Sequence, residues 1–231
     1  MKISRSLLLR MIPYMDGLIS MDELSSQTGI SISVCNAMLN ELIGNGIGSM
    51  EGEGYVRFTH MDRISAVVLA MRLNASMDEV ARVLHWKDFE MLTAEILEAN
   101  GYSTARNVRV RARLGRGSRR GSRTMMEVDV VGLKYVDCRN TALLIDCKHW
   151  HYISTSELAR VCEKQVIRAR TFIAERRDVD DAIPAVVVLN DTPSLIDGVP
   201  IVPITRFREF LNELYSILDE LHVVRRLELE G

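Results

Sequence analysis

A carboxylate and an ammonium group stand two positions apart at the end of an apolar segment. Residues 142–145 read Ala-Leu-Leu-Ile and predict a buried strand, and Asp146 and Lys148 follow it. Because alternate residues of a strand share a face, the two side chains are expected to point the same way. A carboxylate left unpaired beside so apolar a strand would carry a desolvation penalty.

Asp129 lies in the segment EVDVVG, which predicts the strand before this one. We expect the two strands to form a hairpin in which Val136 pairs with Thr141. Asp129 then lies opposite Lys148 and Asp146 is one diagonal step away, so the three side chains are about 5–8 Å apart. A slip of one residue in this register would place them on opposite faces, so their meeting is a hypothesis.

Two carboxylates beside a lysine suit a divalent metal ion that acts on phosphate esters. Mg²⁺ prefers oxygen ligands and keeps several waters, so one or two carboxylates suffice to hold it. The ion would polarise a phosphoryl oxygen and activate a water for attack, while the lysine would orient that water or stabilise the developing charge. The simpler alternative is a surface Asp–Lys pair between strands, which contributes roughly 0.2–1 kcal/mol.

Two predicted helices would position these strands. In the helix expected over 87–100, Glu90 lies at the edge of the apolar stripe and is the acid that could lean toward the sheet. In the helix expected over roughly 156–177, Gln165 lies in the middle of the apolar stripe. A buried amide needs hydrogen-bond partners, so we expect Gln165 to reach the polar end of the strand that carries Asp146.

The order of predicted elements after residue 86 is helix, strands, helix, two strands and helix, which argues for a mixed sheet flanked by helices and an α/β fold class. Four segments in this order, DFEMLTAEILEANGY, EVDVVG, LLIDCK and EKQVIRAR, resemble the PD-(D/E)xK nuclease superfamily with its restriction-endonuclease-like fold. The resemblance is to Mrr-type restriction enzymes and archaeal Holliday-junction resolvases, and it covers about residues 86–205.

The resemblance implies a metal-dependent endonuclease that hydrolyses DNA with Mg²⁺ or Mn²⁺. It implies metal ligands among the acids, a catalytic lysine and a supporting glutamine, which fall on Glu90, Asp129, Asp146, Lys148 and Gln165. Many members carry glutamate where this chain has Asp146, which shortens the ligand arm. The alternative is a non-catalytic DNA-binding or regulatory protein that keeps the nuclease fold.

A cluster of arginines without any acid lies directly before the proposed site. Guanidinium groups bind phosphates in a bidentate manner, and phosphate contacts position a duplex without reading its sequence. We therefore expect a DNA-backbone contact here, although a solvated loop or an arm for an acidic partner are alternatives. The candidate residues are Arg109, Arg111, Arg113, Arg116, Arg119, Arg120 and Arg123.

Residues 1–60 predict three helices followed by a hairpin, and this order resembles a winged helix-turn-helix domain. The exposed face of the third helix offers Ser33, Asn36, Asn40 and Glu41 but no Lys or Arg. Because DNA affinity rests on cations, dimerisation or docking is as reasonable a role as DNA reading. Residues 61–85 are expected to form a helical linker, and 86–231 the nuclease-like domain.

The bulk composition limits these interpretations. The chain has 231 residues and a net charge of −2, so binding to nucleic acid must come from local charge. No apolar run approaches the roughly 18 residues that cross a bilayer, and the four cysteines form no CxxC pair, so we expect a cytoplasmic protein with reduced thiols. One metal site cuts one strand, so cutting both strands predicts a homodimer.

Overall fold

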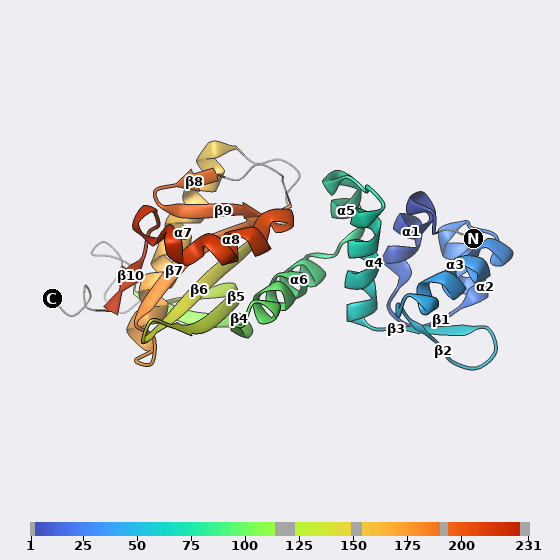
Figure 1. The fold of residues 1–231 in the computed structure, drawn as a ribbon, viewed down its shortest axis with the longest axis horizontal. Coiled ribbons are helices and arrows are strands. Elements are labelled where there is room, and N and C mark those ends of the chain that lie inside the picture. The colour runs from blue at the N-terminus through green and yellow to red at the C-terminus, as the bar shows by residue number, and fades with distance from the viewer. Residues whose placement is uncertain (1–2, 114–122, 149–153, 190–193, 227–231) are drawn as a thin grey trace. The chain divides into compact units, whose positions relative to one another are not determined.

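The computed structural model describes residues 3–113, 123–148, 154–189 and 194–226. By its internal contacts the chain divides into two compact units, Met1–Asp88 and Phe89–Gly231. Each unit has its own helices and its own sheet, and Figure 1 gives their labels.

The first unit combines short helices with a small sheet. Ser20 accepts a hydrogen bond from the Glu23 amide at the start of the second helix, and Gly29 ends that helix in the left-handed conformation. Gly17–Ser20 form a strand that the sequence pattern does not indicate, because four residues are too few to show an alternation. The elements are α1 (Arg5–Met11), β1 (Gly17–Ser20), α2 (Met21–Thr28), α3 (Ile32–Gly44), β2 (Ser49–Met50), β3 (Tyr55–Phe58), α4 (His60–Arg72) and α5 (Met77–Val83).

The sheet of the first unit is antiparallel, with β3 between β1 and β2. The predicted helices and hairpin are all present. Residues 61–85, expected to form a helical linker, form most of α4 together with α5 and fall within the first compact unit. The reason is that α4 is amphipathic enough to bury Ile64, Val67 and Ala70.

The second unit contains the long predicted strands. Among the described residues, no helix combines the length and the apolar content that crossing a membrane requires. The elements are α6 (Trp86–Ala99), β4 (Ser103–Arg113), β5 (Arg123–Val136), β6 (Arg139–Lys148), α7 (Thr155–Glu175), β7 (Asp181–Val188), β8 (Ser194–Ile196), β9 (Val199–Pro203), α8 (Phe207–Glu213) and β10 (Val224–Arg225).

The sheet of the second unit is mixed, as the sequence predicts. Its strand order is β4-β5-β6-β7-β9-β8, and β10 pairs with β7. β4, β5 and β6 are antiparallel neighbours, whereas β7 is parallel to both β6 and β9. The parallel pair requires a crossover, which α7 provides. The prediction of an α/β fold with a mixed sheet flanked by helices is therefore confirmed.

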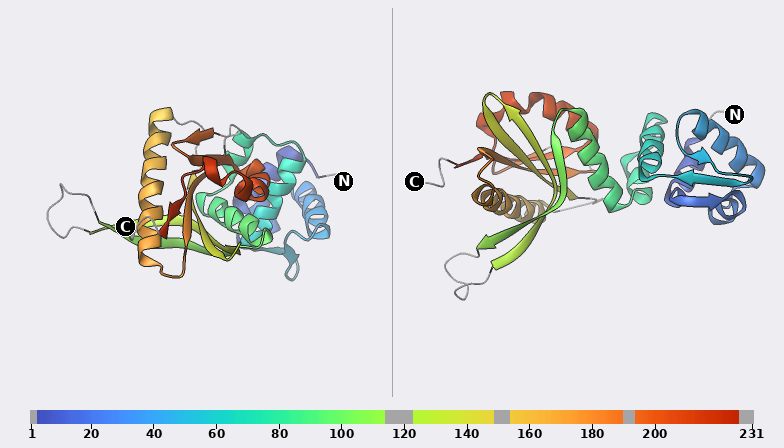
Figure 2. Two further views of the ribbon diagram at one scale, coloured as in Figure 1. Left: turned by 60° about the vertical axis from the view of Figure 1, so that its left-hand side comes forward. Right: turned by 90° about the horizontal axis from the view of Figure 1, so that it is seen from below.

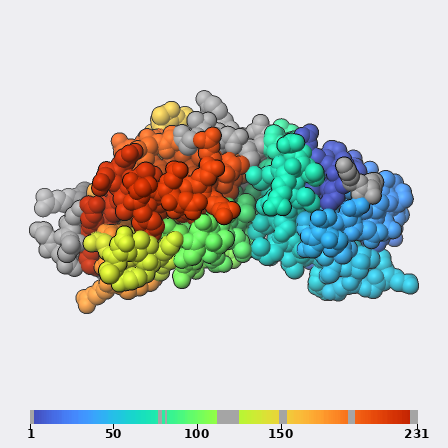
Figure 3. All heavy atoms as spheres, viewed as in Figure 1, coloured from blue at the N-terminus to red at the C-terminus, as the bar shows by residue number. Residues whose placement is uncertain are grey.

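The two faces of this sheet are covered by different helices (Figure 2). On one face, Phe172 and Ile173 of α7 share a buried cluster with Ala142 and Leu144 of β6. On the other, Leu97 of α6 packs against the backbone of β5. Figure 3 shows α8 and the turns that follow it, in red, on the surface of this unit.

The hairpin between β5 and β6 closes with a tighter turn than expected. Val136 pairs with Arg139, so only Asp137 and Cys138 lie between the strands, with φ values of 49° and 62°. Two consecutive positive φ values are typical of a type I′ turn, whose twist matches that of the flanking strands. The predicted pairing of Val136 with Thr141 is therefore wrong by two positions, and an even shift of this kind leaves the paired residues Val130–Val136 and Arg139–Ile145 on their expected faces.

We expect Gly132→Val to destabilise the second unit, because a Cβ at Gly132 would lie 3.1 Å from Leu97 Cδ1 and 3.2 Å from Tyr102 Cδ1. Overpacking of this kind costs about 1–3 kcal/mol. Urea unfolding followed by circular dichroism measures the loss. The control is Ala105→Val, at an exposed position of β4, which should change the unfolding free energy little. Equal stability of the two variants would contradict the packing of α6 on β5.

Candidate active site

The chemistry-bearing residues meet where β5 and β6 separate. The ladder between these strands ends at the pair Val130 and Ile145. At the next residue of β5, the Asp129 side chain replaces a backbone partner. Its Oδ2 accepts a hydrogen bond of 2.7 Å from the backbone amide of Cys147. Asp129 thus lies beside the segment of Asp146, rather than opposite Lys148 as the predicted register has it.

The strands β4 and β5 are irregular at the same point. The register between them is continuous except that Asn107 and Asp129 do not pair, and Asn107 has a φ of 54°. Val128 and Val131 are three residues apart, yet both belong to the buried cluster beneath α7. Strict alternation is therefore interrupted at Asp129. Irregularities of this kind in strands often re-aim a side chain next to an active site.

Asp146 is buried, with 1% of its side chain exposed, and both of its oxygens contact cations. Lys148 Nζ lies 2.7 Å from Oδ2, and Arg168 Nη1 lies 2.6 Å from Oδ1. The predicted placement of Asp146 and Lys148 on one face of β6 agrees with the first contact. The second contact supplies a further positive charge, which helps to compensate the burial of this carboxylate.

Gln165 connects this ion cluster to the backbone of the sheet. Its Nε2 donates to the carbonyl of Leu144 at 2.8 Å and to that of Ala185 at 3.4 Å. Its Oε1 accepts a hydrogen bond of 2.9 Å from Arg168 Nη1. The predicted partner, the polar end of β6, is thus reached through Arg168, a residue that sequence reasoning missed. Its spacing of three residues from Gln165 on α7 was the available signal.

Glu90 and Asp129 have carboxyl groups that resist ionisation. Burial, followed by the charge of Asp129, raises the pKa of Glu90 to about 7, while Arg106 and Lys148 act in the opposite direction. Burial and then the charge of Asp146 raise the pKa of Asp129. The carboxylates therefore lie close enough to repel one another. Groups with raised pKa values in such a cluster are typical of functional sites.

The donor set has the chemistry for a hard divalent cation. Carboxylate oxygens are the ligands that Mg²⁺ prefers, and a bound cation would lower the raised pKa values of Glu90 and Asp129. Within the described ranges, however, no three His, Cys, Asp or Glu side chains are arranged as a formed metal site. Glu90, Asp129 and Asp146 as metal ligands, and Mg²⁺ or Mn²⁺ as the ion, remain a prediction.

The arginine cluster is only partly within the described residues. Arg109 is exposed and lies 3.5 Å from Glu127 on the neighbouring strand, and Arg111 is also exposed. Arg113 and Arg123 pair as the last residues of the β4–β5 ladder. The role of this cluster in DNA binding remains a prediction. Three of its members lie outside the described residues: Arg116, Arg119 and Arg120.

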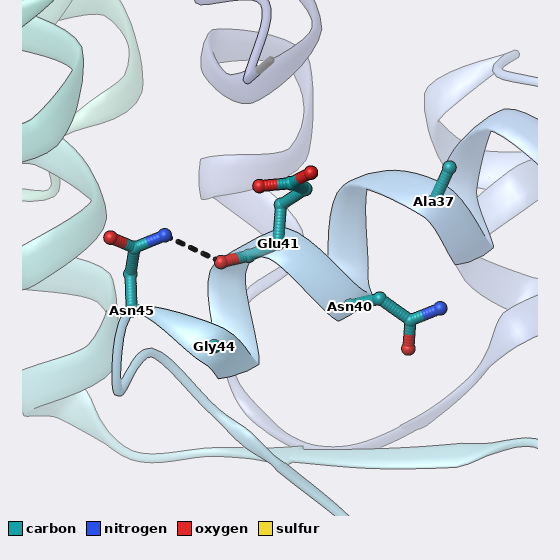
Figure 4. A pocket seen from close by; sticks show the side chains of 5 residues that line it. All are labelled: Ala37, Asn40, Glu41, Gly44 and Asn45. Carbon is teal, nitrogen blue, oxygen red and sulfur yellow. Dashed lines mark hydrogen bonds between the residues drawn. The ribbon is translucent and has the colours of Figure 1, made fainter. Parts of the chain in front are cut away.

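The exposed side of α3 contains a shallow pocket (Figure 4). It is lined by Ala37, Asn40, Glu41, Gly44 and Asn45, and the Asn45 side chain donates to the Glu41 carbonyl at 2.7 Å. None of these lining residues is a cation, in agreement with the sequence pattern of this helix. A role of this face in DNA reading or in docking stays a prediction.

Comparisons with known proteins find distant structural likenesses. No family model matches the chain, and no curated protein matches its sequence. Protein VC1899 from Vibrio cholerae aligns with 93% of this chain and 52% of its own, with 14% identity and a TM-score of 0.42. The restriction endonuclease FokI aligns with 92% of this chain and 43% of its own, with 11% identity and a TM-score of 0.34. The chain thus spans about half the length of these proteins.

We predict that the stability of the metal-free protein falls as pH rises from about 4.5 to about 7, the ordinary and the folded-state pKa of Glu90. In that range the folded state keeps a proton that the unfolded state has released, so raising the pH favours unfolding. Glu90→Gln should flatten this decrease, leaving the contribution of Asp129, whose pKa is also raised. Urea unfolding in EDTA at a series of pH values measures it.

The matched control is Glu163→Gln, at an exposed position of α7. Its stability should follow that of the unmodified protein at every pH. If Glu90→Gln also retained the full decrease, the protonated state of Glu90 in the folded protein would be ruled out.

Proposed function

We propose that the second unit is a metal-dependent endonuclease of the PD-(D/E)xK type that hydrolyses phosphodiester bonds in DNA. One observation supports this proposal above the others. Asp129, Asp146 and Lys148 gather where β5 and β6 separate, and the pKa of Glu90 responds to the charges of Asp129 and Lys148. A structural ion pair between two strands would need neither the additional acids nor the interrupted ladder.

The residues divide between holding a cation and handling charge on the substrate. Asp129 and Asp146, with Glu90, would hold a divalent ion, which supplies polarisation of the phosphoryl oxygen and an acidic water. Lys148 has 23% of its side chain accessible beside its contact with Asp146, and its ammonium group would face the phosphate of a bound substrate. A fixed cation of this kind stabilises the charge that develops on the phosphoryl oxygens during attack.

The arginines of β4 and β5 would hold the DNA backbone. Arg109 and Arg111 are exposed on a strand that continues toward the other arginines in the sequence. Their positive charge is concentrated within a chain of net charge −2, so the attraction for phosphates is local. We further propose that the first unit is a winged helix-turn-helix module that positions or dimerises the protein, and that two copies cut both strands.

A non-catalytic DNA-binding role is the second candidate, and one observation favours it. Both oxygens of Asp146 already contact cations, Lys148 and Arg168. The buried carboxylate is therefore compensated without a metal ion, and a fold that had lost catalysis could keep this arrangement for stability. The cleavage experiment below separates the two candidates.

We expect the protein to cut plasmid DNA with Mg²⁺ or Mn²⁺ and to lose this activity in EDTA. Lys148→Ala and Asp129→Asn should each reduce the rate by about 100-fold or more, because each removes a group that stabilises transition-state charge directly or through the cation. Gel analysis of nicked and linear products measures the rate. Thermal unfolding confirms that the variants are folded.

The matched control is Lys164→Ala, which removes an exposed lysine from α7 and should leave cleavage unchanged. Equal trace cutting by all of these proteins, with no dependence on metal, would leave only the DNA-binding candidate.

We also expect Arg109→Ala and Arg111→Ala to weaken binding to DNA of any sequence. Each lost phosphate contact should reduce the slope of log K against log salt concentration by about 1. Fluorescence anisotropy with a labelled duplex in EDTA at several salt concentrations provides the slope. Arg177→Ala, at an exposed position beyond α7, is the control. Slopes that match that of the unmodified protein would exclude these two arginines from the interface.

A further inference from the structure

Arg168 lies within the candidate site, although no part of the proposed mechanism uses it. Its side chain is 17% exposed, and a single nitrogen, Nη1, donates both to Asp146 Oδ1 at 2.6 Å and to Gln165 Oε1 at 2.9 Å. Holding a long arginine side chain in one conformation costs side-chain entropy, so the contacts that fix Arg168 need an explanation. The contacts of Asp146 and Gln165 indicate a role for this side chain.

Gln165 cannot turn its amide around. It is fully buried, and its NH₂ group donates to carbonyls of two adjacent strands, those of Leu144 on β6 and Ala185 on β7. A primary amide has one oxygen and one NH₂ group, so the oxygen must face away from these carbonyls and toward Arg168. The backbone of the sheet therefore fixes the position of the Arg168 guanidinium group through Gln165.

The guanidinium group in turn distinguishes the two oxygens of Asp146. Oδ1 is held by Arg168, whose own partner is anchored in the sheet. Oδ2 faces Lys148, the more accessible of the two cations at 23% exposure against 17%. Asp146 therefore has one oxygen fixed from the side of α7 and one oxygen directed to the residue that resembles a catalytic lysine.

We propose that Arg168, anchored by Gln165, is a positioning residue that holds Asp146 by Oδ1 so that Oδ2 is presented to Lys148 and to a divalent cation. This inference rests on the proposed function, because it needs a cation at the site. Residues that orient a metal ligand without touching the metal commonly change metal affinity or activity by about 10–100-fold when they are replaced.

A purely electrostatic role for Arg168 leads to different expectations. A fixed positive charge repels a divalent cation, so removing the charge would tighten metal binding, and keeping it would change nothing. Arg168→Lys keeps the charge but loses the planar group that bridges Asp146 and Gln165. Gln165→Met alters no charge, and the hydrogen bonds of Gln165 run to Leu144, Ala185 and Arg168 rather than to Asp146. Positioning predicts weaker metal binding in both variants.

The test measures Mn²⁺ binding to the full chain by isothermal titration calorimetry, alongside plasmid cleavage. Arg168→Lys and Gln165→Met should each raise the Kd for Mn²⁺ by about tenfold or more, and kcat should fall while the KM for DNA stays close to its usual value. The control Arg170→Lys, at an exposed position of α7, should match the unmodified protein. Thermal unfolding in EDTA shows whether each variant folds.

The outcomes separate this inference from the proposed function. Suppose that the unmodified protein binds Mn²⁺ and that folded Arg168→Lys binds it equally tightly or more tightly. This result would overturn the positioning role and leave the nuclease proposal intact. Failure of both variants to fold would also overturn it, because Arg168 and Gln165 would then be required for the structure itself. An unmodified protein that binds no Mn²⁺ would instead refute the metal-dependent function, and this inference with it.

Discussion

The arrangement of the second unit depends on the compensation of one buried carboxylate. Asp146 continues an apolar strand and has 1% of its side chain exposed, so its burial is tolerated only with cations and hydrogen-bond donors around it. Removing one partner of a buried ion pair typically costs about 3–5 kcal/mol, which is comparable to the deletion of a large core side chain. The positions of Lys148 and Arg168, and through Arg168 that of Gln165, follow from this requirement.

Sequence patterns predicted the helices and strands that carry the site better than the register and the contacts between them. The apolar run before Asp146 predicted β6, and the position of Gln165 in an apolar stripe predicted a buried amide with partners at that strand. The register of the hairpin was not predictable, because a two-residue and a four-residue turn are both compatible with the residues around Asp137 and Cys138. In the structure both residues have positive φ values, which are typical of the two-residue turn.

Two further features of the site lay beyond sequence reasoning. The spacing of three residues from Gln165 indicates only that Arg168 lies beside Gln165 on α7, and the fold is needed to show that Arg168 also faces Asp146. The interruption at Asn107 and Asp129 is a property of a strand pair, and each strand alone reads as regular. A pattern along one segment reports its local period, whereas these features arise from contacts between segments that are distant in the chain.

The inner part of this site comes from one contiguous stretch of chain. β6, α7 and β7 form a single strand–helix–strand segment, and Asp146, Gln165, Arg168 and the carbonyl of Ala185 all belong to it. Asp129 and Glu90 come from earlier elements. Contacts that are local in sequence close smaller loops and lose less chain entropy as they form. The contact between Asp129 and the Cys147 amide spans 18 residues and that between Arg168 and Asp146 spans 22, so Asp129 and the scaffold around Asp146 can assemble together as one local unit during folding. Glu90 closes a longer loop to reach them.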